Sequence, residues 1–177
     1  MAGYFTYEPL LRGICKKLTP LSILEWGPGL STKIMVQECP EAKILSIEHS
    51  KEYFRKAREE FRENPNIEII HVQHTLAPGE SEGYVTYPLQ KLLPGRIDVY
   101  DLIFVDGRSR CDCLLLSYLL CSPNGIVILH DSERPNYKKG LAPFPYVFCR
   151  DEESIGVSMA AKNLSRFHMI KEVLDHE

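Results

Sequence analysis

The stretch ILEWGPGLS, residues 23–31, ends an apolar run with an acid and continues into two glycines. Gly27 and Gly29 allow a sharp turn and a close approach of the backbone to a ligand. Pro28 fixes one backbone dihedral and stiffens the loop, and Ser31 is suited to a helix start. We therefore expect a strand, a tight turn and a helix. A Gly-x-Gly turn alone also serves as a simple connection in many α/β folds.

The rest of the chain alternates strand and helix patterns. Strands are expected at 21–25, 43–48, 66–72, 100–105 and 126–129, with a closing pair at 146–150 and 155–160. Helices are expected at 7–18, 31–38, 51–62, 110–121 and 163–174, and Tyr53, Phe54, Ala57 and Phe61 are expected on the inner side of the third. Residues 76–98 look irregular apart from one turn of helix at 89–93, and 123–125 look like a turn. Strands 100–105 and 126–129 are apolar on both faces, which predicts an α/β fold with a mainly parallel sheet.

Composition narrows the class of protein. The 177 residues suit a single domain over 1–177, and the net charge of -3 gives no indication of nucleic acid or an anionic membrane as partner. The apolar stretch 113–121 is too short to span a bilayer. The first ten residues lack a secretory signal pattern. We therefore expect a cytoplasmic protein whose six cysteines are thiols.

Polar or glycine-rich groups follow every central strand, at 25–29, 48–49, 73–74, 106–108 and 130–131. Ligands of parallel sheets bind beyond these carboxyl ends. The loop is not the dinucleotide fingerprint, because Thr32 stands where the third glycine would be. Glu25 would repel phosphate and attract an amino group. Glu48, 19 residues after Gly29, can accept hydrogen bonds from a ribose diol. An amine, a ribose and no phosphate describe S-adenosylmethionine.

These segments resemble class I, Rossmann-like S-adenosylmethionine-dependent methyltransferases. ILEWGPGLST resembles the first motif, ILSIEHS the second, YDLIFVDG the fourth, and PNGIVILHD the fifth strand with its preceding turn. The resemblance implies a three-layer sandwich with a seven-stranded sheet, mostly parallel, whose last strand is antiparallel. It also implies that the glycine loop holds the methionine part, Glu48 the ribose, and Gln73 or His74 the adenine. The expected cofactor-binding residues are Glu25, Gly27, Pro28, Gly29, Ser31, Glu48, His49, His74 and Asp106.

The acceptor chemistry is expected after the strands at 100–105 and 126–129. Asp106, His130 and Asp131 are the candidate catalytic residues, with His130 as general base. The same three residues are a candidate divalent-metal site, although an acid would be more usual than His130. A third reading makes His130 and Asp131 ordinary strand-end residues that shape the pocket.

Two interpretations are open for several other side chains near the expected pocket. Arg108, Arg110 and Arg134 either bind an acidic acceptor or are solvated charges. Tyr84, Tyr87 and Tyr137 are expected in loops that cover a pocket, or in simple packing. The cysteine spacing at 111, 113 and 121 does not suit a structural zinc site, so these are expected to be packing residues.

The leading hypothesis is methyl transfer from S-adenosylmethionine to a small-molecule acceptor, most readily at a hydroxyl oxygen. The alternative is a non-catalytic module that binds S-adenosylmethionine or a nucleoside. A nucleotide-dependent oxidoreductase is disfavoured by the absent third glycine.

Overall fold

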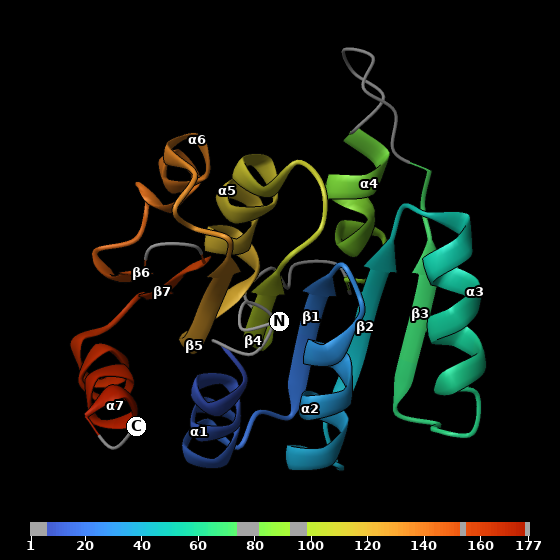
Figure 1. Ribbon diagram of the computed structural model, residues 1–177, viewed down its shortest axis with the longest axis horizontal. Helices are drawn as coiled ribbons and strands as arrows, with labels where there is room; N and C mark the ends of the chain where they lie inside the picture. Colours follow the sequence, from blue (N-terminus) through green and yellow to red (C-terminus); the bar gives the residue numbers. More distant parts are fainter. Residues whose placement is uncertain (1–6, 74–81, 93–98, 153–154, 176–177) are drawn as a thin grey trace.

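Seven strands form one sheet in the order β3-β2-β1-β4-β5-β7-β6 (Figure 1). The computed structural model describes residues 7–73, 82–92, 99–152 and 155–175. The strands are β1 (Ser22–Trp26), β2 (Lys43–Glu48), β3 (Ile67–His71), β4 (Tyr100–Val105), β5 (Cys121–His130), β6 (Tyr146–Glu152) and β7 (Ile155–Ala161). Neighbours from β3 to β5 are parallel, and β7 is antiparallel to both β5 and β6. The predicted Rossmann-like sheet with an antiparallel last strand is confirmed.

The central strands are apolar on both faces because each face meets its own core. In β4, Leu102 and Phe104 belong to one buried cluster, and Ile103 and Val105 belong to the other. The other central strands divide in the same way, since side chains of a strand alternate between the faces of a sheet. The lack of polar alternation in the sequence therefore follows from burial on two sides.

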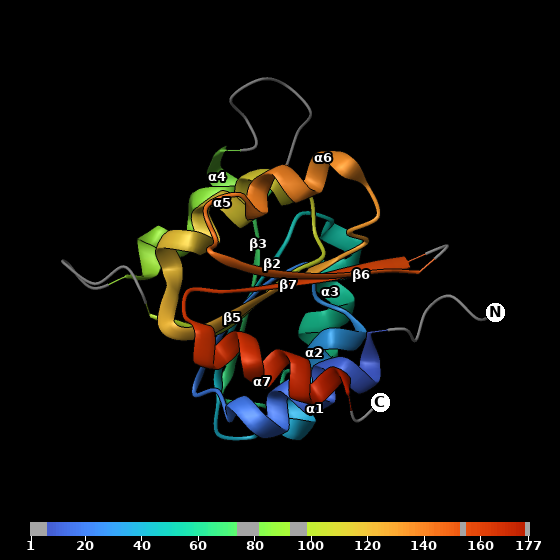
Figure 2. The same ribbon diagram turned by 90° about the vertical axis from the view of Figure 1, so that its left-hand side faces the viewer.

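Helices cover both faces of the sheet (Figure 2). One face carries α1 (Glu8–Leu18), α2 (Leu30–Glu38) and α7 (Leu164–Leu174), and the other carries α4 (Glu82–Thr86), α5 (Arg110–Leu120) and α6 (Pro135–Lys138). The helix α3 (Lys51–Glu60) packs against β2 and β3, and two 3₁₀ helices, η1 (Tyr87–Lys91) and η2 (Lys139–Leu141), complete the described elements. Within the described residues, no helix is both long enough and apolar enough to cross a membrane.

Several local predictions were wrong. β5 begins at Cys121, and the expected turn at 123–125 lies within it as an irregularity: the pairing passes from Tyr100–Cys121 directly to Leu102–Ile126. Residues 82–86 form α4 instead of an irregular segment, and the expected turn of helix at 89–93 corresponds in part to η1 at 87–91; α6 and η2 were not predicted. Tyr53 does not face inward: it is 60% exposed.

Gly13 marks the tightest contact between α1 and α7. A Cβ at this position would lie 2.5 Å from Cγ1 of Val173, which is a clash. The glycine therefore lets α7 approach α1, at the cost of helix propensity in the middle of α1.

We expect Gly13→Ala to lower the free energy of unfolding by about 1–3 kcal/mol through overpacking. In a Val173→Ala background the space is open, and the same change should be neutral or stabilising by up to about 1 kcal/mol, because alanine favours the helix. Urea denaturation of the four proteins measures both effects. An equal penalty in the two backgrounds would contradict this account of the contact.

Candidate functional site

The turn after β1 requires glycine at its first position. Gly27 has a φ of +93°, and a Cβ there would lie 2.9 Å from backbone atoms of Asp106 and Gly107. The backbone of this turn therefore touches the backbone that follows β4. Gly29 has an extended φ of -176°, and a Cβ there would meet nothing within 4 Å. Its role is to leave the space above the loop open.

Glu25 is fully buried and takes part in a network of hydroxyl groups. Its carboxylate accepts hydrogen bonds from Ser31 Oγ at 2.5 Å, Thr32 Oγ1 at 2.7 Å and Ser46 Oγ at 2.7 Å. Burial raises the pKa of Glu25 to about 7, while the three hydroxyl donors act in the opposite direction. These contacts join β1, β2 and the start of α2.

Thr32 explains why the third glycine of the dinucleotide fingerprint is absent. Its hydroxyl oxygen accepts a hydrogen bond from the Gly29 amide at 2.9 Å and donates to Glu25. The side chain therefore caps α2 and orients the carboxylate at once, which glycine could not do.

A pocket of about 510 Å³ lies over the carboxyl ends of the central strands. Its lining residues are Gly27, Pro28, Glu48, His49, Tyr53, Asp106, Gly107, Arg108, Ser109, Arg110, Arg134 and Tyr137. Five expected cofactor-binding residues are in this set: Gly27, Pro28, Glu48, His49 and Asp106. The size is within the range of small-molecule sites, about 300–1,000 Å³.

Three other predicted residues lie elsewhere. Glu25 and Ser31 are buried beneath the loop and do not line the pocket, so the structure does not place the Glu25 carboxylate where an amino group would meet it. Gly29 lines a smaller pocket of about 230 Å³ on the α2–α3 side of the loop. His74 lies outside the described residues.

Glu48 stands at the end of β2, with one oxygen engaged. Its Oε1 accepts a hydrogen bond from the Ser50 amide at 2.6 Å and lies 2.8 Å from His49 Nδ1. Its Oε2 has no hydrogen-bond partner within the part of the chain that the structure describes. On the far side of the His49 ring, Nε2 lies 3.4 Å from Arg108 Nε, which links the end of β2 to the loop after β4.

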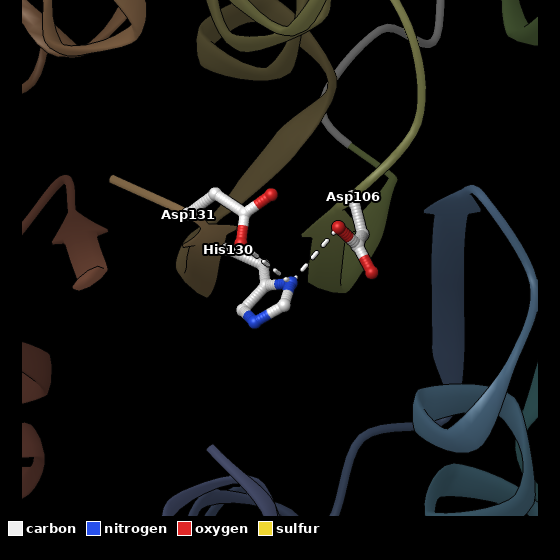
Figure 3. Close-up of side chains that lie close together, drawn as sticks. All are labelled: Asp106, His130 and Asp131. Carbon is white, nitrogen blue, oxygen red and sulfur yellow. Dashed lines mark hydrogen bonds and ion pairs between the residues drawn. The ribbon is translucent and has the colours of Figure 1, made fainter. Parts of the chain in front are cut away.

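Asp106, His130 and Asp131 come together at the ends of β4 and β5 (Figure 3). His130 Nδ1 lies 2.9 Å from Asp106 Oδ1 and 3.6 Å from Asp131 Oδ1. The other ring nitrogen, Nε2, is buried without a hydrogen-bond partner among the described residues, and the ring packs edge-on against Tyr7 with centroids 4.6 Å apart. Only Asp106 of the three lines the pocket.

Arg110 holds this cluster together, a role that the sequence did not reveal. Its guanidinium lies 2.9 Å from Asp106 Oδ1 and 2.8 Å from Asp131 Oδ2. It also donates to the carbonyl oxygens of Asp106, Gly107 and His130, at 3.0, 3.0 and 2.6 Å. The buried side chain thus clamps the ends of two neighbouring strands.

The contacts of Arg110 with both carboxylates argue against the predicted metal site. One ligand atom from each of Asp106, His130 and Asp131 can be chosen within 4.8 Å of the others. Yet both carboxylates already have Arg110 as their cation, and a divalent ion among them would stand beside a guanidinium that it repels. These residues do not fit a divalent metal.

The three predicted loop tyrosines have different positions. Tyr137 lines the pocket, Tyr87 is half-buried in η1, and Tyr84 is fully buried in α4. The Tyr84 hydroxyl occupies the place where a Cβ of Gly107 would be, so Tyr84 lies beneath the loop and does not cover the pocket.

Structural comparison supports the fold assignment. An O-methyltransferase from Bacillus cereus in complex with SAH superposes with a TM-score of 0.65 and 16% identity, over 89% of this chain and 81% of that one. The chain has a Rossmann-like methyltransferase fold. A methyltransferase-like protein from Silicibacter pomeroyi gives a TM-score of 0.63 at 17% identity, over 98% and 96% of the two chains.

The fold extends to another kind of enzyme. Spermidine synthase from Thermotoga maritima matches with a TM-score of 0.64 and 13% identity, over 95% of this chain but only 62% of its own length. No protein-family model matches the sequence, and no curated protein matches it. The pocket and its lining residues are therefore the features that indicate a function.

The buried Glu25 predicts an inverse pH dependence of stability. With a pKa of about 7 in the folded protein against 4.5 as the ordinary value, the folded state keeps a proton that the unfolded chain loses between these pH values. This contribution is complete below pH 4.5 and is lost as the pH rises through 7, a change on the order of 3 kcal/mol.

Urea denaturation at a series of pH values should show this loss in the wild type and its absence in Glu25→Gln. The exposed Glu41→Gln is the control, and it should keep the wild-type profile. Parallel profiles for wild type and Glu25→Gln would show that Glu25 titrates normally.

Proposed function

We propose that this protein binds S-adenosylmethionine in the 510 Å³ pocket and transfers its methyl group to a hydroxyl oxygen of a small molecule. The observation that carries the proposal is Glu48 Oε2, which has no hydrogen-bond partner among the described residues and belongs to a side chain that lines the pocket with the glycine turn. A buried carboxylate with such an oxygen at the end of β2 suits a ribose hydroxyl, while its charge disfavours a ribose phosphate. The fold shared with an SAH-bound O-methyltransferase is consistent with this cofactor.

Each part of the cofactor is proposed to contact a different group of pocket residues. The turn at Gly27 and Pro28 supports the methionine part, Glu48 the ribose, and His49 and Tyr53 lie beyond it. Glu25 is a positioning residue in this proposal, because it holds the start of α2 against the strands without reaching the ligand. The domain is proposed to comprise residues 1–177, in a cytoplasmic protein.

Asp106 is the proposed proton acceptor. Its Oδ1 is held by His130 and Arg110, while Oδ2 has no partner among the described residues. As the S–CH₃ bond of the sulfonium breaks and the O–CH₃ bond forms, the hydroxyl proton passes to Asp106. The products are a methyl ether and S-adenosylhomocysteine. Alignment and exclusion of water supply the rest of the acceleration.

His130 acts through Asp106 in this mechanism. The Nδ1–H tautomer donates to Asp106 Oδ1 and fixes the direction of the free oxygen. Asp131 in turn orients Arg110. The group predicted as general base thus becomes a positioning residue, because it does not line the pocket.

The alternative function is a non-catalytic module that binds S-adenosylmethionine or a nucleoside. The position of His130 and Asp131 favours this alternative. His130 Nε2 is buried beside Tyr7, and neither His130 nor Asp131 lines the pocket. Transfer of a tritiated methyl group to any member of a library of hydroxylated acceptors would decide between the two functions.

The cofactor proposal predicts which carboxylate matters for affinity. Calorimetry should detect S-adenosylhomocysteine binding to the wild type, and Glu48→Ala should cost about 1.5–3 kcal/mol, the usual contribution of hydrogen bonds to a charged group. Glu52→Ala, in the exposed face of α3, should bind like the wild type. Unchanged affinity in Glu48→Ala would remove Glu48 from the ribose site.

The catalytic proposal predicts different effects of two His130 variants. Asp106→Asn should leave the affinity for S-adenosylhomocysteine near the wild-type value and lower turnover by roughly 10²–10⁴. His130→Ala should also lower turnover, and His130→Asn should restore part of it, since the amide can donate to Asp106 in place of Nδ1.

Turnover should be the same with and without a chelator, because Arg110 occupies the place of a cation. Equal activity of His130→Ala and His130→Asn would contradict the positioning role. Loss of activity in the chelator, restored by magnesium or manganese, would contradict the account of Arg110.

A further inference from the structure

The pocket is lined by positive charge that close contacts with the described residues neutralise only in part. Among its lining residues are two carboxylates, Glu48 and Asp106, and three arginines, Arg108, Arg110 and Arg134. Both carboxylates have close partners, as described above. Which arginines remain available to a ligand therefore decides what the pocket recognises.

Arg110 is not available. It is buried, and its guanidinium is shared between two carboxylates and three backbone carbonyl groups. A ligand could engage it only by breaking the clamp between β4 and β5. This excludes one of the three arginines that the sequence suggested for an acidic acceptor.

Arg108 has no carboxylate partner in the described structure. The one polar contact of its side chain there is the 3.4 Å approach of Nε to His49 Nε2. Both terminal nitrogens are left without a partner among the described residues. The exposed side chain therefore lines the pocket with its terminal donors available to a ligand.

Arg134 is oriented by Tyr137, and its two ion pairs with carboxylates are long. Its Nη1 donates to the Tyr137 hydroxyl at 3.2 Å, and its guanidinium carbon lies 5.6 Å from the centre of that ring. Its distances to Asp131 and Glu133 are long, 3.9 and 3.6 Å. Asp131 has a shorter partner in Arg110 at 2.8 Å, and Glu133 accepts from the Gly156 amide at 2.9 Å.

We propose that the methyl acceptor carries an anionic group, a carboxylate or a phosphate, which Arg108 and Arg134 bind at the mouth of the pocket. The two side chains come from the loops after β4 and β5, next to the proposed proton acceptor Asp106. Guanidinium groups bind carboxylate and phosphate through paired hydrogen bonds. The inference rests on the proposed function, because it assigns the acceptor to the part of the pocket that the cofactor leaves free.

The experiment uses inorganic phosphate and benzoate as probes of the two anion types. Each is titrated into protein saturated with S-adenosylhomocysteine, at constant ionic strength, and binding is followed by the amide signals of Gly107 and Ser109 in NMR spectra. We expect saturable binding of at least one probe. Arg108→Gln and Arg134→Gln should each weaken it by about tenfold or more.

Arg62→Gln is the matched control, because it removes the same charge from the exposed turn that follows α3. It should leave probe binding unchanged. Affinity for S-adenosylhomocysteine should be similar in all three variants. Arg134→Lys should bind the probes better than Arg134→Gln, since it keeps the charge while losing the planar fork.

Three results would overturn the inference. The first is that neither probe binds the saturated protein. The second is that both bind only when S-adenosylhomocysteine is absent, which would assign the arginines to the cofactor's own carboxylate. The third is that Arg62→Gln weakens binding as much as the pocket variants do, which would indicate a general charge effect.

Failure of the proposed function would look different. The protein would not bind S-adenosylhomocysteine at all, while the same titration of the free protein would still report whether Arg108 and Arg134 bind an anion.

Discussion

The position of the loop depends on one buried carboxylate. Glu25 receives three hydroxyl hydrogen bonds from two elements other than its own strand, so β1, β2 and the start of α2 are joined at a single point. Burying a carboxylate is costly unless its oxygens are satisfied. Here Ser31, Thr32 and Ser46 offset part of this cost, and their arrangement fixes where the glycine turn begins.

A second constraint works in the same manner at the next pair of strands. Parallel strands that carry acids at their carboxyl ends bring like charges together, and Arg110 resolves this repulsion between Asp106 and Asp131. An arginine at this place supplies a fixed cation with directional donors, which also bind backbone carbonyl groups. The clamp therefore gives rigidity to the part of the pocket where the proposed chemistry takes place.

Much of the fold could be predicted from the sequence because the central strands are apolar on both faces. Two strands, 43–48 and 100–105, were predicted with the bounds that the structure shows. Because the carboxyl ends of parallel strands meet at one edge of the sheet, the sequence also predicted correctly that Asp106, His130 and Asp131 lie close together. These predictions depend on local pattern and on general topology, which a sequence displays directly.

The remaining features depend on contacts between distant residues. The partners of Glu25 lie 6, 7 and 21 positions away, and nothing in their spacing shows that they satisfy the carboxylate and keep it from a ligand. Tyr84 lies in a segment rich in turn formers, yet it is buried because Gly107 leaves room for its hydroxyl. In the sequence Arg110 is recognisable only as an arginine at the start of a helix. Its contact with Asp131 depends on the pairing of β4 with β5, which the sequence does not show.

The contact between Gly27 and Gly107 has a consequence for how such a pocket can diversify. Backbone meets backbone there, and the Tyr84 hydroxyl also fills the space beside Gly107, so neither glycine can be replaced by a residue with a side chain without displacing its neighbours. A change of ligand preference is therefore easier to make at Arg134 and Tyr137, which line the same pocket from the segment after β5. The middle of the sheet edge is fixed by main-chain packing, whereas its flank contributes side chains that can be exchanged.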